Sequence, residues 1–107
     1  MKLDDLAKKP LERGEVIVDG IFFMNGNLDL ESEKMLSLGT VIVSIDAGVT
    51  WKKCTDVPQT TYRLGILGEY VNQNGVAEVL LIGRVKQVGE VGAAIKTALF
   101  SQNIIME

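Results

Sequence analysis

One stretch of the chain, residues 62–85, constrains the fold more than any other. It reads YRLGILGEYVNQNGVAEVLLIGRV and is the densest apolar segment of the sequence. Two apolar runs, 62–71 and 76–85, flank an Asn/Gly-rich segment at 72–75, and this pattern is typical of two strands joined by a turn. The unbroken apolar residues at 79–82 indicate a strand that is covered by other elements or by a neighbouring subunit.

A second apolar run lies near the start of the chain. Residues 15–24, EVIVDGIFFM, are mostly β-branched or aromatic, which predicts a strand that is buried on both faces or lies in a subunit contact. Gly20 inside this run is a candidate β-bulge. The dipeptide Asn25-Gly26, which follows directly, predicts a turn.

Between these two runs, the pattern leaves the secondary structure of residues 28–36 ambiguous but clearly predicts strands at residues 38–53. Residues 28–36 fit either a strand, because the first leucines alternate with polar residues, or a short helix in ESEKML. Residues 38–45 alternate with the period of two that a strand requires. A turn at 46–48 and a short returning strand at 49–53 follow, so the sequence predicts a further hairpin here.

The period of the pattern changes near the C-terminus. From Glu90 onward a stripe of apolar residues recurs at helical spacing. The stripe consists of Val91, Ala94, Ile95, Ala98 and Leu99. Asn103 is a candidate helix end, because Asn tolerates the left-handed backbone conformation, and residues 104–106 can return as a final strand. The expected fold is mainly β with one short C-terminal helix (α+β), in a small barrel-like or sandwich-like domain.

The expected domain organisation is a flexible N-terminal arm, residues 1–14, followed by a single β-rich domain, residues 15–107. The arm is mostly charged, and Pro10 and Gly14 limit any helix in it to about two turns, which is marginal in water. The chain of 107 residues has the length of one domain. Because a core of this size is thin, oligomerisation would add stability.

Charge and composition argue against several classes of function. The net charge is −3 and basic residues are at most paired, so the concentrated basic footprint of a nucleic-acid-binding protein is missing. No apolar run approaches the roughly 18 residues of a membrane span, and the polar N-terminus does not resemble a signal peptide. The lone cysteine, Cys54, excludes an internal disulfide. We expect an intracellular soluble protein without nucleic-acid or membrane partners.

The sequence predicts no catalytic, cofactor-binding or metal-binding residues, and no cofactor. It lacks histidine, which is the commonest general base and a frequent metal ligand. No neighbouring base is evident that would lower the pKa of Cys54. The paired carboxylates Asp4/Asp5 and Glu31/Glu33 lie in polar stretches, which is typical of a solvated surface. The glycine pairs Gly65/Gly68 and Gly89/Gly92 lack the other residues of a phosphate-binding loop. We therefore expect that the protein is not an enzyme.

One local motif is sharper. Residues 44–51, SIDAGVTW, fit the pattern S-x-D-x-G-x-T-W and so resemble the Asp box that recurs in bacterial sialidases and other β-propellers. Ser44, Asp46 and Thr50 can hydrogen-bond the backbone of a tight turn, and Trp51 can pack beneath the hairpin. A propeller needs several blades of about four strands, whereas this chain has a single box. We interpret the motif as a structural hairpin, not as a sign of sialidase activity.

A series of short motifs runs in order through residues 38–107. They are GTVI at 39–42, LGIL at 64–67, LIGRV at 81–85, Ala98-Leu99, and NII at 103–105. In this order and spacing they resemble the bacteriophage head-decoration family, the lambda-type capsid-stabilising proteins. The resemblance covers roughly two thirds of the chain.

The resemblance implies a structural role. The chain would be a small β-rich subunit that assembles as a homotrimer, binds the major capsid protein shell after the head expands, and stabilises it. It would lie on the capsid surface of the virion, and in the host cytoplasm during assembly. The family's N-terminal arm orders on the shell, which would suit residues 1–14. The alternative is a small β-domain that binds carbohydrate or another ligand, for example in a phage tail or fibre, as the Asp-box hairpin and Trp51 indicate.

Overall fold

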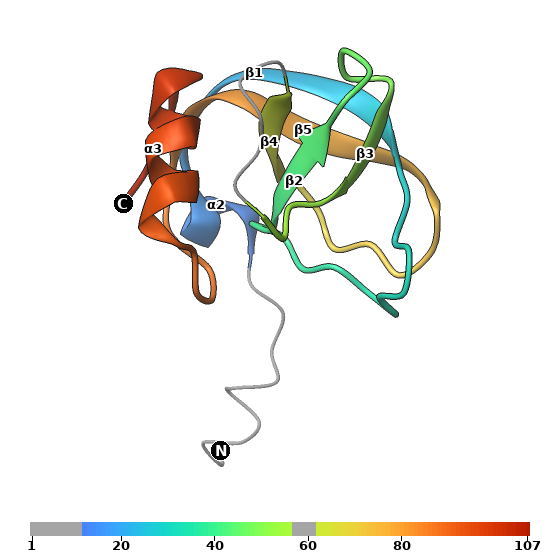
Figure 1. The fold of residues 1–107 in the computed structure, drawn as a ribbon. Coiled ribbons are helices and arrows are strands. Elements are labelled where there is room, and N and C mark those ends of the chain that lie inside the picture. Colours follow the sequence, from blue (N-terminus) through green and yellow to red (C-terminus); the bar gives the residue numbers. More distant parts are fainter. Residues whose placement is uncertain (1–11, 57–61) are drawn as a thin grey trace, which may run out of the picture.

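The computed structural model describes residues 12–56 and 62–107, and six strands within them form one sheet. The sheet order is β1-β3-β2-β4-β5-β6, and a further pairing of β1 with β5 closes the first five of these into a barrel. β6 extends the sheet beyond β5, and α3 packs beside it (Figure 1). The strands are β1 (Ile17–Leu28), β2 (Val41–Ser44), β3 (Thr50–Lys53), β4 (Arg63–Leu67), β5 (Gly75–Val85) and β6 (Ile104–Met106). The helices of the described residues are α2 (Arg13–Val16) and α3 (Ala93–Ser101).

The expected fold class is confirmed, since the chain is mainly β with one short C-terminal helix. The predicted helical stripe lies on α3 and the loop before it, where Leu99 is fully buried and Ile95 packs against the same core. The helix ends before Asn103, whose φ of 68° is left-handed, and β6 follows as predicted. No helix in the described ranges is long and apolar enough to cross a membrane.

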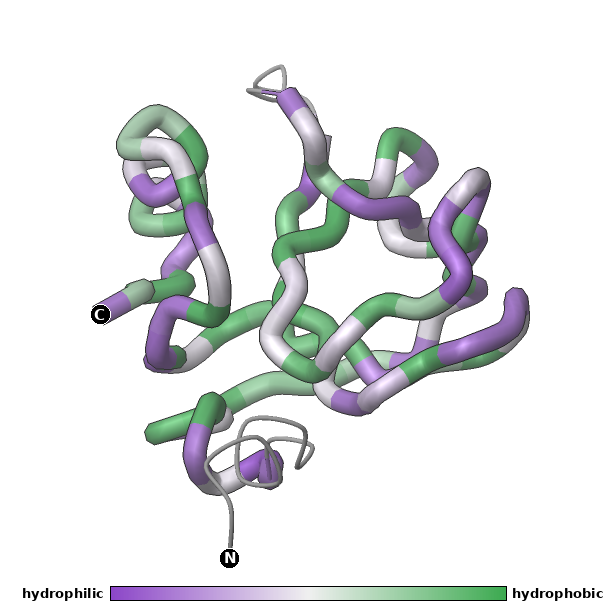
Figure 2. Tube along the Cα trace, turned by 90° about the horizontal axis from the view of Figure 1, so that it is seen from below, coloured by the Kyte–Doolittle hydropathy of each residue, from purple (hydrophilic) through white to green (hydrophobic). Residues whose placement is uncertain are grey.

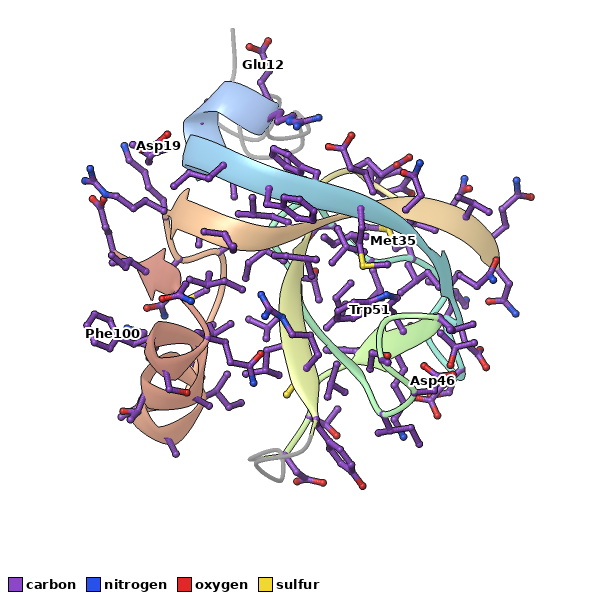
Figure 3. All side chains as sticks on the ribbon, turned by 90° about the horizontal axis from the view of Figure 1, so that it is seen from above. Glu12, Asp19, Met35, Asp46, Trp51 and Phe100 are labelled. Carbon is purple, nitrogen blue, oxygen red and sulfur yellow. The ribbon has the colours of Figure 1, made fainter. Side chains whose placement is uncertain are left out.

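Two hydrophobic clusters lie on opposite sides of the barrel wall, and successive residues of the central strands divide between them. In β2, Val41 and Val43 belong to a cluster that also contains Leu99 of α3, whereas Ile42 between them belongs to a cluster around Trp51. Figure 3 shows Trp51 inside the ring of strands. Apolar residues are concentrated on the strands and polar ones on the connecting turns (Figure 2). The central strands are therefore apolar on both faces because each face is covered.

The apolar run at residues 76–85, which lies in β5, also divides its side chains between the two clusters. Val79 packs in the cluster around Trp51, and Leu80 packs in the cluster beneath α3. The sequence predicted that residues 79–82 are covered. Val79 and Leu80 are buried by other parts of the same chain, and Leu81 and Ile82 are half-buried. The strand predicted at 62–71 ends earlier, at Leu67. Beyond it, the residue at position 71 pairs with Leu36 instead.

The turn predicted at Asn25-Gly26 is wrong. β1 continues through both residues to Leu28, with Asn25 opposite Glu78 and Gly26 opposite Ala77 on β5. The local turn signal is overridden because a long antiparallel ladder holds this segment extended. Glycine at position 26 serves packing: a Cβ there would overlap the indole ring of Trp51.

The bulge predicted at Gly20 is confirmed by shifts in the β1–β5 register on both sides of this residue. The expectation that residues 15–24 are buried on both faces is wrong for the single chain, because the segment from Val18 to Phe22 is exposed throughout. The first residues of this run form the short helix α2, and the strand begins only at Ile17. The other expectation, that the run lies in a subunit contact, stays a prediction.

The ambiguous segment 28–36 forms neither the short helix nor a full strand. Leu28 ends β1, and Leu30 and Leu36 are buried in the cluster around Trp51 while the chain between them turns. The backbone bends at Glu31, whose φ is 55°. The three leucines pack this loop against the barrel, although the loop forms no helix or strand. The apolar residues of this segment were therefore a sign of burial and not of a regular secondary structure.

The described part of the chain begins at Glu12, inside the expected arm of residues 1–14. The guanidinium of Arg13 lies 4.3 Å from the centroid of the Phe23 ring and forms an ion pair with Glu78. Arg13 therefore contacts both β1 and β5. Residues 1–11 of the expected arm lie outside the described part of the chain.

Candidate interaction surface

The Asp-box hairpin between β2 and β3 is stapled by its own side chains. The Ser44 hydroxyl donates to Asp46 Oδ1 at 2.8 Å and accepts the Gly48 N–H at 2.8 Å. The two carboxylate oxygens of Asp46 accept the Thr50 N–H at 2.9 Å and the Thr50 hydroxyl at 2.6 Å. Gly48 has a φ of 91°, which favours glycine in the tight turn. The predicted hairpin is confirmed, and hydrogen bonds from its own side chains hold the turn.

These hydrogen bonds also fix the charge of the turn. The Thr50 hydroxyl, followed by the Thr50 amide and the Ser44 hydroxyl, lowers the pKa of Asp46 from 3.8 to about 2, because each bond favours the ionised carboxylate. The side chain is exposed to solvent (Figure 3). The hairpin therefore presents a permanent negative charge at neutral pH.

Trp51 is a core residue. Its side chain is 1% exposed, and its indole Nε1–H donates to the Gly48 carbonyl at 2.9 Å. The ring lies against Gly26 and Gly65, where a Cβ would approach it closely. A buried ring offers no face on which a sugar could stack, so the residue that motivated carbohydrate binding has a structural use.

The remaining candidates for chemistry occupy structural positions. Burial, reinforced by the charge of Asp56, raises the pKa of the Cys54 thiol, which lowers its thiolate fraction and its reactivity. Gly65 lies within β4 and Gly89 in the loop before α3, so neither begins a phosphate-binding loop. Among residues 12–56 and 62–107, no three His, Cys, Asp or Glu side chains gather where they could hold a metal ion.

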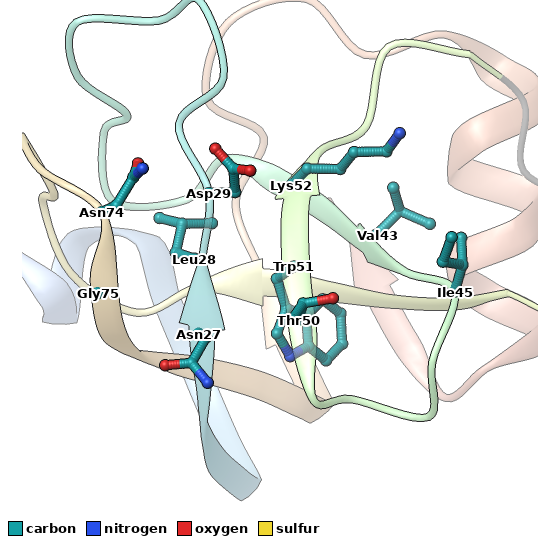
Figure 4. Close-up of a pocket in the computed structure, with 10 residues that line it drawn as sticks. All are labelled: Asn27, Leu28, Asp29, Val43, Ile45, Thr50, Trp51, Lys52, Asn74 and Gly75. Carbon is teal, nitrogen blue, oxygen red and sulfur yellow. The ribbon is translucent and has the colours of Figure 1, made fainter.

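A surface pocket of about 490 Å³ lies over β1 and β3 (Figure 4). Its size is within the range of small-ligand sites. The Asp29 carboxylate and the Asn74 side-chain carbonyl each already accept a backbone N–H, from Glu31 and Leu30 respectively, both at 2.8 Å. These groups thus shape the adjoining loop. The lining residues are Asn27, Leu28, Asp29, Val43, Ile45, Thr50, Trp51, Lys52, Asn74 and Gly75.

Exposed apolar side chains lie at several places on the described surface, and two of these places adjoin β1. The first, here the β1 ridge, consists of Val18, Ile21 and Phe22, exposed by 45%, 66% and 54%. The second, the hairpin notch, is a hollow of about 390 Å³ between β1, the Asp-box turn and the start of β5. The notch is lined by Met24, Asn25, Gly26, Asn27, Ala47, Gly48, Val49 and Val76. A third group, Phe100 and Ile105, lies on α3 and β6.

Sequence reasoning located the β1 ridge within an apolar run but not its exposure. The signal that distinguishes exposure from burial here is the pair of glycines, Gly20 on β1 and Gly83 opposite it on β5. A Cβ on Gly83 would overlap the carbonyl oxygen of Asp19. Facing glycines in neighbouring strands indicate a close, irregular crossing, which turns the following residues out of the wall.

The motifs that carry the family resemblance lie on consecutive neighbours of the sheet. Val41 and Ile42 of β2 pair with Ile66 and Gly65 of β4, and β5 follows β4 in the sheet. Gly83 of β5 then pairs with the first residue of β6. Comparison with known proteins finds no match for the chain among family models, curated proteins or solved structures.

Proposed function

We propose that this chain is a structural, non-enzymatic subunit: a capsid-decoration protein of phage or prophage origin that binds the expanded head shell as a homotrimer and stabilises it. Its partners are two further copies of itself and the major capsid protein. The proposal places it on the outer surface of the virion, and in the host cytoplasm before assembly.

The observation that carries the proposal is the ordered set of motifs from residue 39 to residue 105, together with their placement. They occupy β2, β4, β5, α3 and β6, and the four strands among these are consecutive neighbours in the sheet. A small barrel with little helix is what the head-decoration resemblance implies. The hydrogen-bonded Asp-box hairpin and the exposed apolar surfaces further support a protein that works by contact, because preorganised surfaces lose little conformational freedom on binding.

The proposal is tested by shell binding and by mass in solution. Purified protein is incubated with expanded and with unexpanded shells assembled from its cognate major capsid protein, and bound chain is measured by co-sedimentation. We expect saturable binding to expanded shells, weak binding to unexpanded ones, and a higher temperature of shell disruption when decorated. Light scattering is expected to give about three times the chain mass of 11.7 kDa. A monomer at tens of micromolar that ignores expanded shells would overturn the proposal.

The alternative, ligand binding by a small β-domain, now depends on the pocket over β1 and β3, because Trp51 is buried. Screening glycans against the wild type and a Lys52→Ala variant separates the two functions, since Lys52 lines the pocket. Glycan binding that the variant loses, without shell binding by either protein, would favour the alternative.

A further inference from the structure

The dipeptide Asn-Gly occurs twice in the chain, at residues 25–26 and 74–75. In this dipeptide the backbone nitrogen of the glycine can attack the side-chain carbonyl carbon of the asparagine, because glycine has no Cβ to obstruct the approach and its backbone is free to rotate. The two sites have the same local chemistry. Any difference in their reactivity therefore comes from the fold.

The first site is held by the barrel. Asn25 and Gly26 lie inside the β1–β5 ladder, opposite Glu78 and Ala77. Side chains of a strand stand roughly perpendicular to the sheet, whereas its backbone N–H groups lie in the plane of the ladder, so the reacting carbon and nitrogen cannot meet while the ladder is intact. Gly26 is also buried, and a Cβ there would overlap the indole ring of Trp51. The fold thus protects Asn25.

The second site is open. Asn74 and Gly75 are both exposed, and Gly75 is the first residue of β5, at the end of the ladder opposite Leu28. No atom lies within 4 Å of a Cβ built on Gly75. Both residues line two surface hollows, the pocket of about 490 Å³ shown in Figure 4 and a smaller one of about 200 Å³. The peptide bond between them therefore has room to rotate and is accessible to water.

A hydrogen bond at this site also favours the attack. The side-chain oxygen of Asn74 accepts the Leu30 N–H at 2.8 Å. This oxygen takes up negative charge when the Gly75 nitrogen adds to the side-chain carbon, and a donor placed at such an oxygen stabilises the intermediate. The bond that anchors the loop 28–36 to the start of β5 thus activates the Asn74 amide as well.

We propose that Asn74 is a site of spontaneous deamidation in the folded protein, while Asn25 stays intact. Hydroxide removes the proton of the Gly75 N–H, the nitrogen bonds to the Asn74 side-chain carbon, and the carbon–nitrogen bond of the amide breaks. The leaving nitrogen takes a proton from water and departs as ammonia, so a cyclic imide remains. Water then adds to either carbonyl of the ring and opens it to aspartate or isoaspartate, with no change of oxidation state.

The modification changes the pocket in two ways. Asp29 and Lys52 are the charged residues among the described lining, so the lining is balanced before deamidation and net negative after it. Isoaspartate additionally lengthens the main chain by one carbon and shortens the side chain by one. Its carboxylate is then drawn away from the Leu30 N–H, and the loop 28–36 loses this anchor. The proposal goes beyond the capsid role and does not depend on it.

Peptide mapping of aged protein tests the site. The folded chain is incubated at pH 8, and conversion at each asparagine is followed by mass spectrometry of its peptides. We expect Asn74 to convert at least about tenfold faster than Asn25, a difference of about 1.4 kcal/mol in activation free energy, and the rate to rise with pH. In urea the two sites are expected to convert at similar rates, because only their sequence neighbours remain. Asn25 is thus the control within the same molecule.

Two further controls separate exposure from the effect of glycine. Asn72 is exposed in the same loop but precedes Gln73, whose side chain obstructs the attack, so we expect it to stay largely intact. Gly75→Ala places a methyl group beside the attacking nitrogen and is expected to slow conversion of Asn74. Equal conversion of Asn25 and Asn74 in the folded chain, or an Asn74 that reacts in urea alone, would overturn the proposed site.

Hydrogen exchange of the Leu30 amide tests the structural consequence. The isoaspartyl fraction is separated by ion exchange, and its Leu30 amide is expected to exchange faster than in fresh protein. Asn74→Asp is the matched control, because it adds the charge and keeps an acceptor for the Leu30 N–H. Unchanged exchange in the isoaspartyl fraction would overturn the loss of the anchor. Shell binding by fresh protein tests the proposed function separately, since none of these outcomes bears on it.

Discussion

Asp46 shows how a single residue can couple a local turn to pH. Because its pKa is about 2 in the folded chain and 3.8 in an ordinary environment, the folded state holds fewer protons than the unfolded state between these values. The hairpin's contribution to stability is therefore complete above about pH 4 and is lost as the pH falls towards 2.

This coupling predicts the behaviour of an Asp46→Asn variant. Its thermal midpoint is expected to lie below that of the wild type at pH 7, because the amide cannot accept the Thr50 bonds as strongly. The gap is expected to narrow towards pH 2, where the wild type loses the same interaction. Thermal unfolding followed between pH 7 and pH 2 measures this, with Asp19→Asn, an exposed aspartate outside the hairpin, as control. A gap independent of pH would contradict the assignment.

The residues of this turn were predictable because their interactions are local in sequence. Ser44, Asp46 and Thr50 lie within six positions of one another, and their spacing alone specified the hydrogen bonds that form. The burial of Trp51 was anticipated for the same reason. What sequence reasoning could not supply was the second contact surface of that ring, which comes from Gly26 and Gly65 on two other strands.

At the scale of elements, the irregular crossing of β1 and β5 is the feature with the clearest stability consequence. Gly83 and Gly75 both lie in β5 with similar φ values, 155° and 152°, which strain any other residue. The two glycines differ in the room available for a side chain. A Cβ at Gly83 would overlap the Asp19 carbonyl, whereas nothing lies within 4 Å of a Cβ at Gly75.

Alanine at these two positions separates strain from overlap. Gly75→Ala is expected to cost about 1 kcal/mol of unfolding free energy, the low end for a strained backbone. Gly83→Ala is expected to cost about 3 kcal/mol, because β1 must also move away from β5. Urea unfolding midpoints, at unchanged slope, measure both. Equal losses would show that the crossing tolerates a side chain.

Elements formed by interactions local in sequence were predicted, and those formed by pairing with distant segments were not. Helix α3, β6 and the hairpin between β2 and β3 follow from local periodicity and turn residues, and the sequence predicted them. The turn at Asn25-Gly26 was wrong because β5, some fifty positions away, pairs with this segment. The outward path of Val18 to Phe22 likewise depends on a register shift against β5 that no local pattern encodes.

For the whole molecule, closure of the barrel decides which segments belong to the domain. β1 pairs with β5 along its length and with β3 only at its end, so the N-terminal strand closes the structure. α2 precedes it and is fixed by Arg13, which lies over Phe23 and pairs with Glu78. Within the described residues, the first long-range contacts that tie the N-terminal segment to the barrel are therefore those of Arg13.

Two truncations test this boundary together with the role of the arm. Removing residues 1–11 keeps Arg13, so the unfolding midpoint and the trimer mass are expected to stay unchanged while binding to expanded shells weakens, because three arms on one trimer add to its avidity. Removing residues 1–14 is expected to weaken shell binding equally and also to lower the free energy of unfolding by about 1 kcal/mol, through loss of the cation–π contact and a partly exposed ion pair.

Arg13→Ala in the full chain is the matched control: it should reproduce the loss of stability and leave shell binding intact. If removal of residues 1–11 alone unfolds the domain, the arm is part of the core, and its role in attachment to the shell fails with it.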